Sequence, residues 1–191
     1  MDEAKLIKRI KTGDMDAFSQ LVGAYEKKAI NYAYRMLNDA SDAEDATQEA
    51  FLKVFDKIDT FREKSTFSTW FYTVLNNVCL DILRKRSRSA DTISINQTAN
   101  DDDEYELQLE DSAPGPYEQL QKNEAQRLLQ DAIAQLSNEH RTMIIMRDIN
   151  GFDYEEIAKI TGVSLGTVKS RLSRARLALR SILKENRELF T

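Results

Sequence analysis

The C-terminal stretch "DYEEIAKITGVSLGTVKSRLSRARLALR" (Asp153–Arg180) has the pattern of two helices joined by a tight turn. Asp153 and Glu156 are spaced as a reciprocal capping pair at a helix start, and Gly162 suits the turn before a second capping residue, Ser164. Apolar residues stand where the two helices of a helix-turn-helix pack together: Ile157, Ala158, Val163, Val168 and Leu172. We therefore predict a helix-turn-helix.

The second helix of this motif should have one buried stripe and one basic outer face. At helical spacing the stripe consists of Val168, Leu172, Ala175, Leu179 and Ile182. The residues left outside are Thr167, Lys169, Ser170, Arg171, Arg174 and Arg176. No Asp or Glu occurs between Thr161 and Arg180, so this face favours DNA, with its first residues in the major groove and its later arginines near phosphates. A solvated basic helix without a ligand is the alternative.

The formal net charge of −5 belongs to the middle of the chain. Residues 91–124 carry one basic residue and ten acidic ones, together with both prolines, and show neither helical nor strand periodicity. This composition predicts a flexible acidic linker over 91–124, between a domain at 1–90 and a domain at 125–191. Because salt screens charge over about 8 Å, the linker's acidity does not oppose DNA binding elsewhere on the molecule.

Both flanks of the linker have the pattern of helices. Apolar residues recur at three- and four-residue spacing, the chain has only 6 glycines, and no alternating β-branched run exceeds a few residues. The predicted fold is all-α, with two small helical domains, the second of which contains the helix-turn-helix.

The segment "SDAEDATQEAFLKVFDKI" (Ser41–Ile58) predicts a helix with one apolar face. Ser41 and Glu44 have the spacing of a capping box, which places the helix start at Ser41. The opposite face is polar and contains Asp45, Gln48 and Glu49, with Leu52 among them. Leu52 is either a stray surface leucine or part of a docking site for another protein.

A second helix of this domain is expected from about Thr66 to Arg86, with Phe67, Phe71, Val74, Val78 and Ile82 on its buried stripe. Beside the stripe runs a ridge of Trp70, Thr73, Asn77 and Arg84, and the preceding loop adds Arg62 and Lys64. Aromatic rings interleaved with cations suit single-stranded nucleic acid, because bases stack on rings while phosphates bind Lys and Arg. Simple packing of Phe67 and Trp70 remains the alternative.

Several function classes lack the residues that they need. The single Cys79 and single His140 provide neither a disulfide nor a Cys/His metal set, and the acidic run Asp101–Glu104 is typical of a solvated segment. Without a glycine-rich phosphate loop or converging catalytic groups, we expect no enzyme activity, cofactor or metal. A receiver-type regulator would require alternating strands and helices, and a purely protein-binding adaptor would leave the basic face unexplained. No apolar run spans a membrane or forms a secretory signal, so a cytoplasmic location is expected.

Three motifs in order, "DAEDATQEAF", "FSTWFYTVLNN" and "GTVKSRLSRAR", resemble the extracytoplasmic-function (ECF) class of bacterial RNA polymerase sigma factors. The resemblance covers both helical domains and implies a region-two domain (1–90) and a region-four domain (125–191). It implies that the chain binds core RNA polymerase and promoter DNA and directs promoter-specific transcription initiation. It also implies an alternative, stress- or signal-responsive factor held by an anti-sigma protein.

The same resemblance implies roles for the surface residues named above. Core polymerase would contact Asp45, Gln48, Glu49 and Leu52, which gives Leu52 a docking role. The minus-ten element would be melted and captured by Phe67, Trp70, Asn77 and Arg84 with the loop that contains Arg62 and Lys64. Asn77 is chosen over the adjacent Asn76 because Asn77 lies on the ridge. The minus-thirty-five element would be read by Thr167, Lys169, Ser170, Arg171 and Arg174, to which the outward position adds Arg176. The acidic linker would thread toward the polymerase active-site cleft and RNA exit path.

Overall fold

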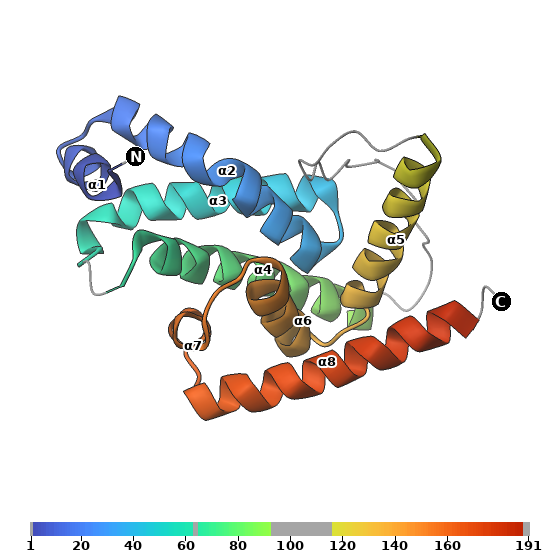
Figure 1. Cartoon of the computed structure of the whole chain (residues 1–191). Coiled ribbons are helices and arrows are strands. Elements are labelled where there is room, and N and C mark those ends of the chain that lie inside the picture. The colour runs from blue at the N-terminus through green and yellow to red at the C-terminus, as the bar shows by residue number, and fades with distance from the viewer. Residues whose placement is uncertain (1, 63–64, 93–115, 189–191) are drawn as a thin grey trace.

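The computed structural model describes the backbone of residues 2–62, 65–92 and 116–188, and the side chains of these residues except 90–92, 116–123 and 186–188. Every regular element in these ranges is helical, which confirms the predicted all-α fold (Figure 1). In chain order the elements are α1 (Glu3–Lys11), α2 (Met15–Leu37), α3 (Ala40–Lys57), the 3-10 turn η1 (Ile58–Thr60), α4 (Phe67–Thr92), α5 (Pro116–Ala134), α6 (Asn138–Ile144), the π-helical turn η2 (Ile145–Ile149), α7 (Tyr154–Thr161) and α8 (Leu165–Glu188).

The start of α3 differs from the prediction of a capping box at Ser41. Asn38 ends α2 in the left-handed conformation (φ 53°), which leaves Asp39 extended. The Asp39 carboxylate then accepts a hydrogen bond from the Asp42 amide at 2.8 Å, so α3 begins at Ala40. The Ser41 prediction is wrong because a better-placed carboxylate caps the helix two residues earlier.

The core of the first domain lies between α2, α3 and α4. The apolar face predicted for α3 is buried, except that Phe55 is half-exposed. The Tyr32 hydroxyl, which is fully buried, donates a hydrogen bond to Asn76 Oδ1 at 2.8 Å. Burial raises the pKa of Tyr32, so the hydroxyl keeps the proton that it donates. Asn76 is therefore a core residue, whereas its neighbour Asn77 is exposed.

The predicted helix-turn-helix is present as α7 and α8. Asp153 and Glu156 form the reciprocal capping box, with hydrogen bonds of 2.7 and 2.9 Å. Gly162 ends α7 in the left-handed conformation (φ 69°), which glycine adopts without strain, and Ser164 Oγ accepts from the Thr167 amide at 3.1 Å. Buried side chains join the two helices: Ile157, Ile160, Val168, Leu172 and Ala175.

The predicted linker, 91–124, overlaps helical segments at both ends. α4 continues to Thr92, and α5 begins at Pro116, where a proline costs nothing because the first helical amide has no partner in its own helix. Residues 93–115 lie outside the described residues. The domain boundaries at 90 and 125 therefore stay a proposal.

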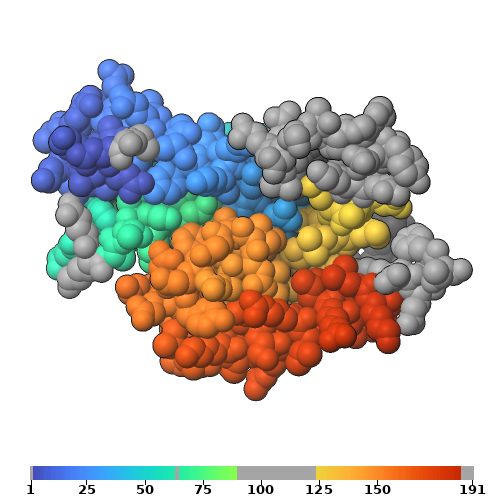
Figure 2. Space-filling view, viewed as in Figure 1, coloured from blue at the N-terminus to red at the C-terminus, as the bar shows by residue number. Residues whose placement is uncertain are grey.

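The second domain packs directly on the first in this structure. Figure 2 shows the part of the chain from α6 to α8 against the helices of the first domain. The rings of Tyr72 on α4 and Phe152, just before α7, meet edge to face with centroids 4.9 Å apart. Phe152 is buried, as is Tyr72, so this contact is part of a shared apolar interface.

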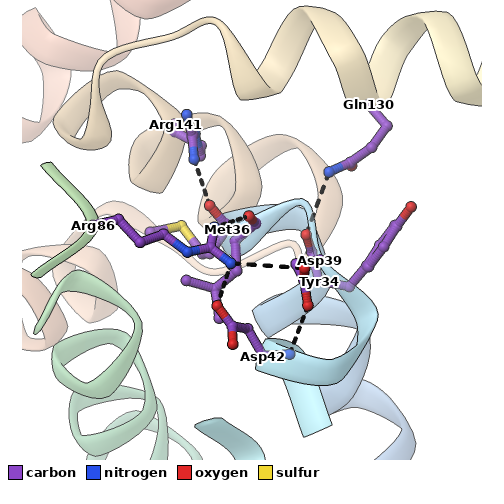
Figure 3. A network of polar contacts seen from close by, with 8 residues as sticks. Tyr34, Met36, Asp39, Asp42, Arg86, Gln130 and Arg141 are labelled. Carbon is purple, nitrogen blue, oxygen red and sulfur yellow. Dashed lines mark hydrogen bonds and ion pairs between the residues drawn. The ribbon is translucent and has the colours of Figure 1, made fainter. Parts of the chain in front are cut away.

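Polar side chains from both domains converge on the C-terminal end of α2, an arrangement that we call the α2 clasp (Figure 3). Gln130 on α5 donates to the Asn38 side chain at 2.9 Å and to the Tyr34 carbonyl at 3.3 Å. Arg141 on α6 donates to the Met36 carbonyl at 2.5 Å, and Arg86 on α4 donates to the Leu37 carbonyl at 2.8 Å. The Met36 and Leu37 carbonyls lie in the last turn of α2, where the helix itself provides no partner, so Arg141 and Arg86 satisfy groups that would otherwise need water. The Tyr34 carbonyl also accepts from the Asn38 amide at 2.8 Å.

Candidate nucleic-acid and protein interfaces

The outer face of α3 brings together the four residues predicted to contact polymerase. All four are exposed: Asp45, Gln48, Glu49 and Leu52. Leu52 is 65% exposed, and Glu49 forms an ion pair with Lys53 at 2.6 Å one turn along the helix. An apolar side chain surrounded by hydrogen-bonding groups is the usual composition of a protein-docking surface.

The α4 ridge is formed as expected, and Phe67 lies on the buried stripe beside it. Asn77 and Arg84 are exposed and Trp70 is half-buried, while Arg84 forms an ion pair with Asp81 at 2.9 Å. Phe67 is only 2% exposed, because its ring packs against those of Tyr25, Phe61, Trp70 and Phe71. For Phe67 the packing alternative therefore holds in this structure, and its ring is not available to stack on a base.

The loop before α4 is described only in part. Arg62 is exposed, whereas Lys64 lies outside the described residues. Phe61, immediately before Arg62, is buried with its ring 5.1 Å from that of Trp70. The packing of Phe61 therefore holds the start of the loop against α4.

A cleft of about 280 Å³ lies between α3 and α4, a feature that the sequence did not reveal. The charged residues that line it are Lys53, Arg84, Lys85, Arg88, Glu49 and Asp81, so cations outnumber carboxylates. Periodicity describes one helix at a time and cannot show which side chains of two helices share a cleft. Lys53 of α3 lines this cleft together with Arg84, Lys85 and Arg88 of α4, so the basic surface of α4 extends to α3.

The outer face of α8 contains two kinds of cation. Arg171 forms an ion pair with Glu139 at 3.0 Å, and Arg176 forms a two-point interaction with Asp148 at 2.5 and 3.0 Å. The hydrogen bond to Asp148 raises the pKa of Arg176. Lys169 and Arg174 are exposed and have no ion-pair partner among the residues that the structure describes. They are the cations most readily available to a phosphate.

The described part of the chain lacks two other features. No helix there is long and apolar enough to cross a membrane. Nor do three or more His, Cys, Asp or Glu side chains gather there as metal ligands.

Comparison with known proteins defines the class of the chain. Residues 21–89 match the family Sigma-70 region 2, and residues 126–179 match Sigma-70, region 4. The first match covers α3 and most of α2 and α4, and the second covers α7 and more than half of α8. The fold is thus that of a sigma-70-type protein.

Whole-chain relatives narrow the class further. The chain is 33% identical over 181 residues to the ECF RNA polymerase sigma factor SigW of Bacillus subtilis, covering 95% of this chain and 96% of that protein. It is 33% identical over 184 residues to the RNA polymerase sigma-H factor of Pseudomonas aeruginosa, covering 95% and 94%. The chain therefore belongs to the ECF class of RNA polymerase sigma factors, which are transcription initiation factors.

Solved structures agree with this assignment. The sigma factor RpoE of Bartonella quintana, solved in complex with the anti-sigma factor NepR, has a TM-score of 0.65 and 29% identity, covering 87% of this chain and 96% of that one. CnrH, solved in complex with the cytosolic domain of CnrY, has a TM-score of 0.66, covering 94% and 96%. At 22% identity the second likeness supports the fold alone.

Proposed function

We propose that the chain binds core RNA polymerase through the outer face of α3, opens the minus-ten element with α4 and the preceding loop, and reads the minus-thirty-five element with α8. The carrying observation is that three separate exposed faces lie on the two regions matched by the sigma-70 families. The chain acts in the cytoplasm, where it contributes binding and no catalysis of its own. Its first domain extends to residue 90, and its second begins at 125.

The proposal is tested by reconstitution. Core RNA polymerase alone should not start transcription at the promoters of this factor, and addition of the purified chain should produce transcripts with defined starts. Mapping those starts after overproduction in cells should give a shared pair of upstream elements. Failure of the chain to comigrate with core polymerase would contradict the proposal.

An anti-sigma protein is the proposed regulator. The similar RpoE is bound to an anti-sigma factor in its solved structure, and the chain described here has a similar fold. An anti-sigma protein that binds both domains would keep them packed together as they are in this structure. Co-purification from the native host, followed by loss of transcription when the captured protein is added back, tests this regulation.

The compact form cannot read both promoter elements at once. A chain of 191 residues folded as one body has a radius of gyration of about 16 Å and hence a diameter of about 40 Å. Elements about 25 base pairs apart are separated by about 85 Å of duplex at 3.4 Å per base pair. We infer that the α2 clasp and the Tyr72–Phe152 contact open when the factor engages a promoter.

Arg174→Ala should weaken binding to every DNA sequence alike and reduce the slope of log affinity against log salt by about one, because its guanidinium is free to bind a phosphate. A salt series on promoter DNA and on DNA with a scrambled upstream element measures both quantities. Lys184→Ala, also exposed on α8 but beyond the expected groove, is the matched control. A change confined to the promoter sequence would assign Arg174 to base reading instead.

Arg171→Ala should cost about 1–3 kcal/mol on the preferred minus-thirty-five sequence and relax discrimination at one base position, if Arg171 leaves Glu139 to bind that base. Glu139→Gln breaks the same ion pair while retaining Arg171. It should therefore bind the promoter at least as well as the parent chain. Equal losses in both variants would show that the ion pair matters only for folding.

Arg62→Ala should slow open-complex formation on duplex promoters, because the exposed guanidinium would lose a phosphate of the displaced strand. On a template already melted across the minus-ten element the defect should shrink. Permanganate reactivity of unpaired thymines measures opening, and Lys57→Ala, exposed on α3, is the control. Identical defects on the two templates would count against a role in melting.

A further inference from the structure

The first helix of the chain has no role in the assignments made so far. α1 lies outside the Sigma-70 region 2 match, which begins at residue 21. Its apolar side chains, Leu6, Ile7 and Ile10, are buried, so the helix is firmly attached to the domain. Figure 1 shows α1 at the same end of the molecule as the C-terminal end of α3 and the start of α4. The loop before α4, which contains Arg62, begins at this end of the molecule.

Lys11, at the end of α1, bonds to the segment before that loop. Its ammonium donates a hydrogen bond to the Phe61 carbonyl at 2.7 Å, across 50 residues of sequence. Lys11 forms no ion pair among the described residues, so the Phe61 carbonyl is the polar partner of its ammonium group there. Hydrogen bonds from a charged donor are stronger than neutral ones. Lys11 therefore fixes the backbone of Phe61.

Phe61 in turn connects the loop to α4. Its amide donates to the Ile58 carbonyl at 3.1 Å, and its buried ring lies 5.1 Å from Trp70 and 5.9 Å from Phe67. The next residue is the exposed Arg62. A shift of the Phe61 backbone would therefore move Arg62 and the ring on which Trp70 rests.

A second contact attaches α1 to the same group of rings. Tyr25 donates from its hydroxyl to Glu3 Oε1 at 2.6 Å, and its ring lies 5.3 Å from that of Phe67. Burial and the nearby Glu3 charge raise the pKa of Tyr25, which keeps its proton for this bond. The two ends of α1 thus hold two sides of the ring cluster formed by Tyr25, Phe61, Phe67, Trp70 and Phe71.

We propose that α1 is a positioning element for promoter melting, in which Lys11 holds the Phe61 carbonyl and so places Arg62 and Trp70 for the displaced strand. This inference rests on the proposed minus-ten role of α4 and its preceding loop. Lys11 does not contact DNA in this account; it acts through Phe61. A positioning role predicts a selective defect in opening, whereas a purely structural role predicts a general loss of folded protein.

The experiment compares Lys11→Met with Lys8→Met in the full chain bound to core polymerase. Methionine keeps the aliphatic stem but loses the donor, and Lys8 is an exposed lysine of the same helix with no partner among the described residues. Lys11→Met should reduce the rate of duplex opening by about three- to tenfold, with unchanged affinity for core polymerase. The defect should shrink on a premelted template, and Lys11→Arg should restore most of the rate.

The outcomes separate this inference from the proposed function. Equal opening rates for Lys11→Met and Lys8→Met would overturn it, as would a loss of thermal stability and core binding that matches the loss of opening. If Lys11→Met is defective, adding Arg62→Ala should produce less than the product of the two separate effects. Normal opening by Arg62→Ala and Trp70→Ala would refute the minus-ten assignment itself, whatever Lys11→Met does.

Discussion

Leu52→Glu is expected to weaken binding to core RNA polymerase by at least about 2 kcal/mol, or roughly thirtyfold, while the helical circular dichroism stays unchanged. Leu52 is 65% exposed in the free chain, so its replacement removes little from the core of the first domain. In a complex the same side chain would be enclosed by the neighbouring Asp45, Gln48 and Glu49 and by the partner surface. A carboxylate there would be desolvated without a counter-charge.

The matched control for this variant is Met15→Glu. Met15 is a large apolar residue of the same domain, 56% exposed, and it stands at the first position of α2, where a carboxylate is favourable. Titration of each chain with core polymerase, read by fluorescence anisotropy, measures the affinities. Equal affinity of Leu52→Glu and the parent chain would make Leu52 a stray surface leucine.

Local signals in the sequence predicted the helix-turn-helix correctly because its determinants lie close together. The Asp153–Glu156 box and the Gly162 turn involve residues three or four positions apart. The capping box at Ser41 had equally good spacing and was wrong. Its failure depends on the left-handed Asn38, which frees Asp39 to cap first, and spacing alone does not rank two competing caps.

Contacts between distant segments explain what the sequence could not predict. Helical spacing predicts that Phe67 is buried, but it does not predict that the Phe67 ring packs against Phe61 and Tyr25, which come from two other parts of the chain. The choice of Asn77 over Asn76 followed from helical periodicity, and the buried bond between Asn76 and Tyr32 now gives its physical reason. The Lys11–Phe61 hydrogen bond spans 50 residues and leaves no periodic signal in either segment.

The packing of the two domains was also invisible to the sequence, and it has a mechanistic consequence. Arg141 serves its own domain by donating to the carbonyls of Ala134 and Leu136, and it also donates to Met36 of the first domain. Burial, reinforced by the charge of nearby Arg86, lowers the pKa of Arg141. Because the buried Arg141 donates to carbonyls of both domains, the two domains cannot separate without breaking the α2 clasp. When the domains separate, the Met36 carbonyl loses the hydrogen bond from Arg141, and water must replace the lost donor.

A reversible thiol cross-link across the clasp should therefore abolish promoter-specific transcription. Cysteines at Asn38 and Gln130 replace side chains whose polar atoms are 2.9 Å apart, one from each domain. A cleavable bis-thiol reagent that joins them would hold the chain compact. The cross-linked chain could bind the minus-ten or the minus-thirty-five element but not both at once. Because the affinity gained by binding both elements is then lost, transcription should fall by about a hundredfold or more.

The design contains its own controls. Cys79 is buried, and burial raises the pKa of its thiol to about 12, so the reagent should not modify it. Asn38 has a positive φ, and cysteine there costs about 1–2 kcal/mol, an effect that the singly substituted Asn38→Cys chain measures directly. Each single variant treated with the reagent should stay active, and cleavage of the cross-link in the double variant should restore transcription. Full activity of the cross-linked chain at a promoter that requires both elements would show that the compact arrangement is competent, and the inferred opening would then be wrong.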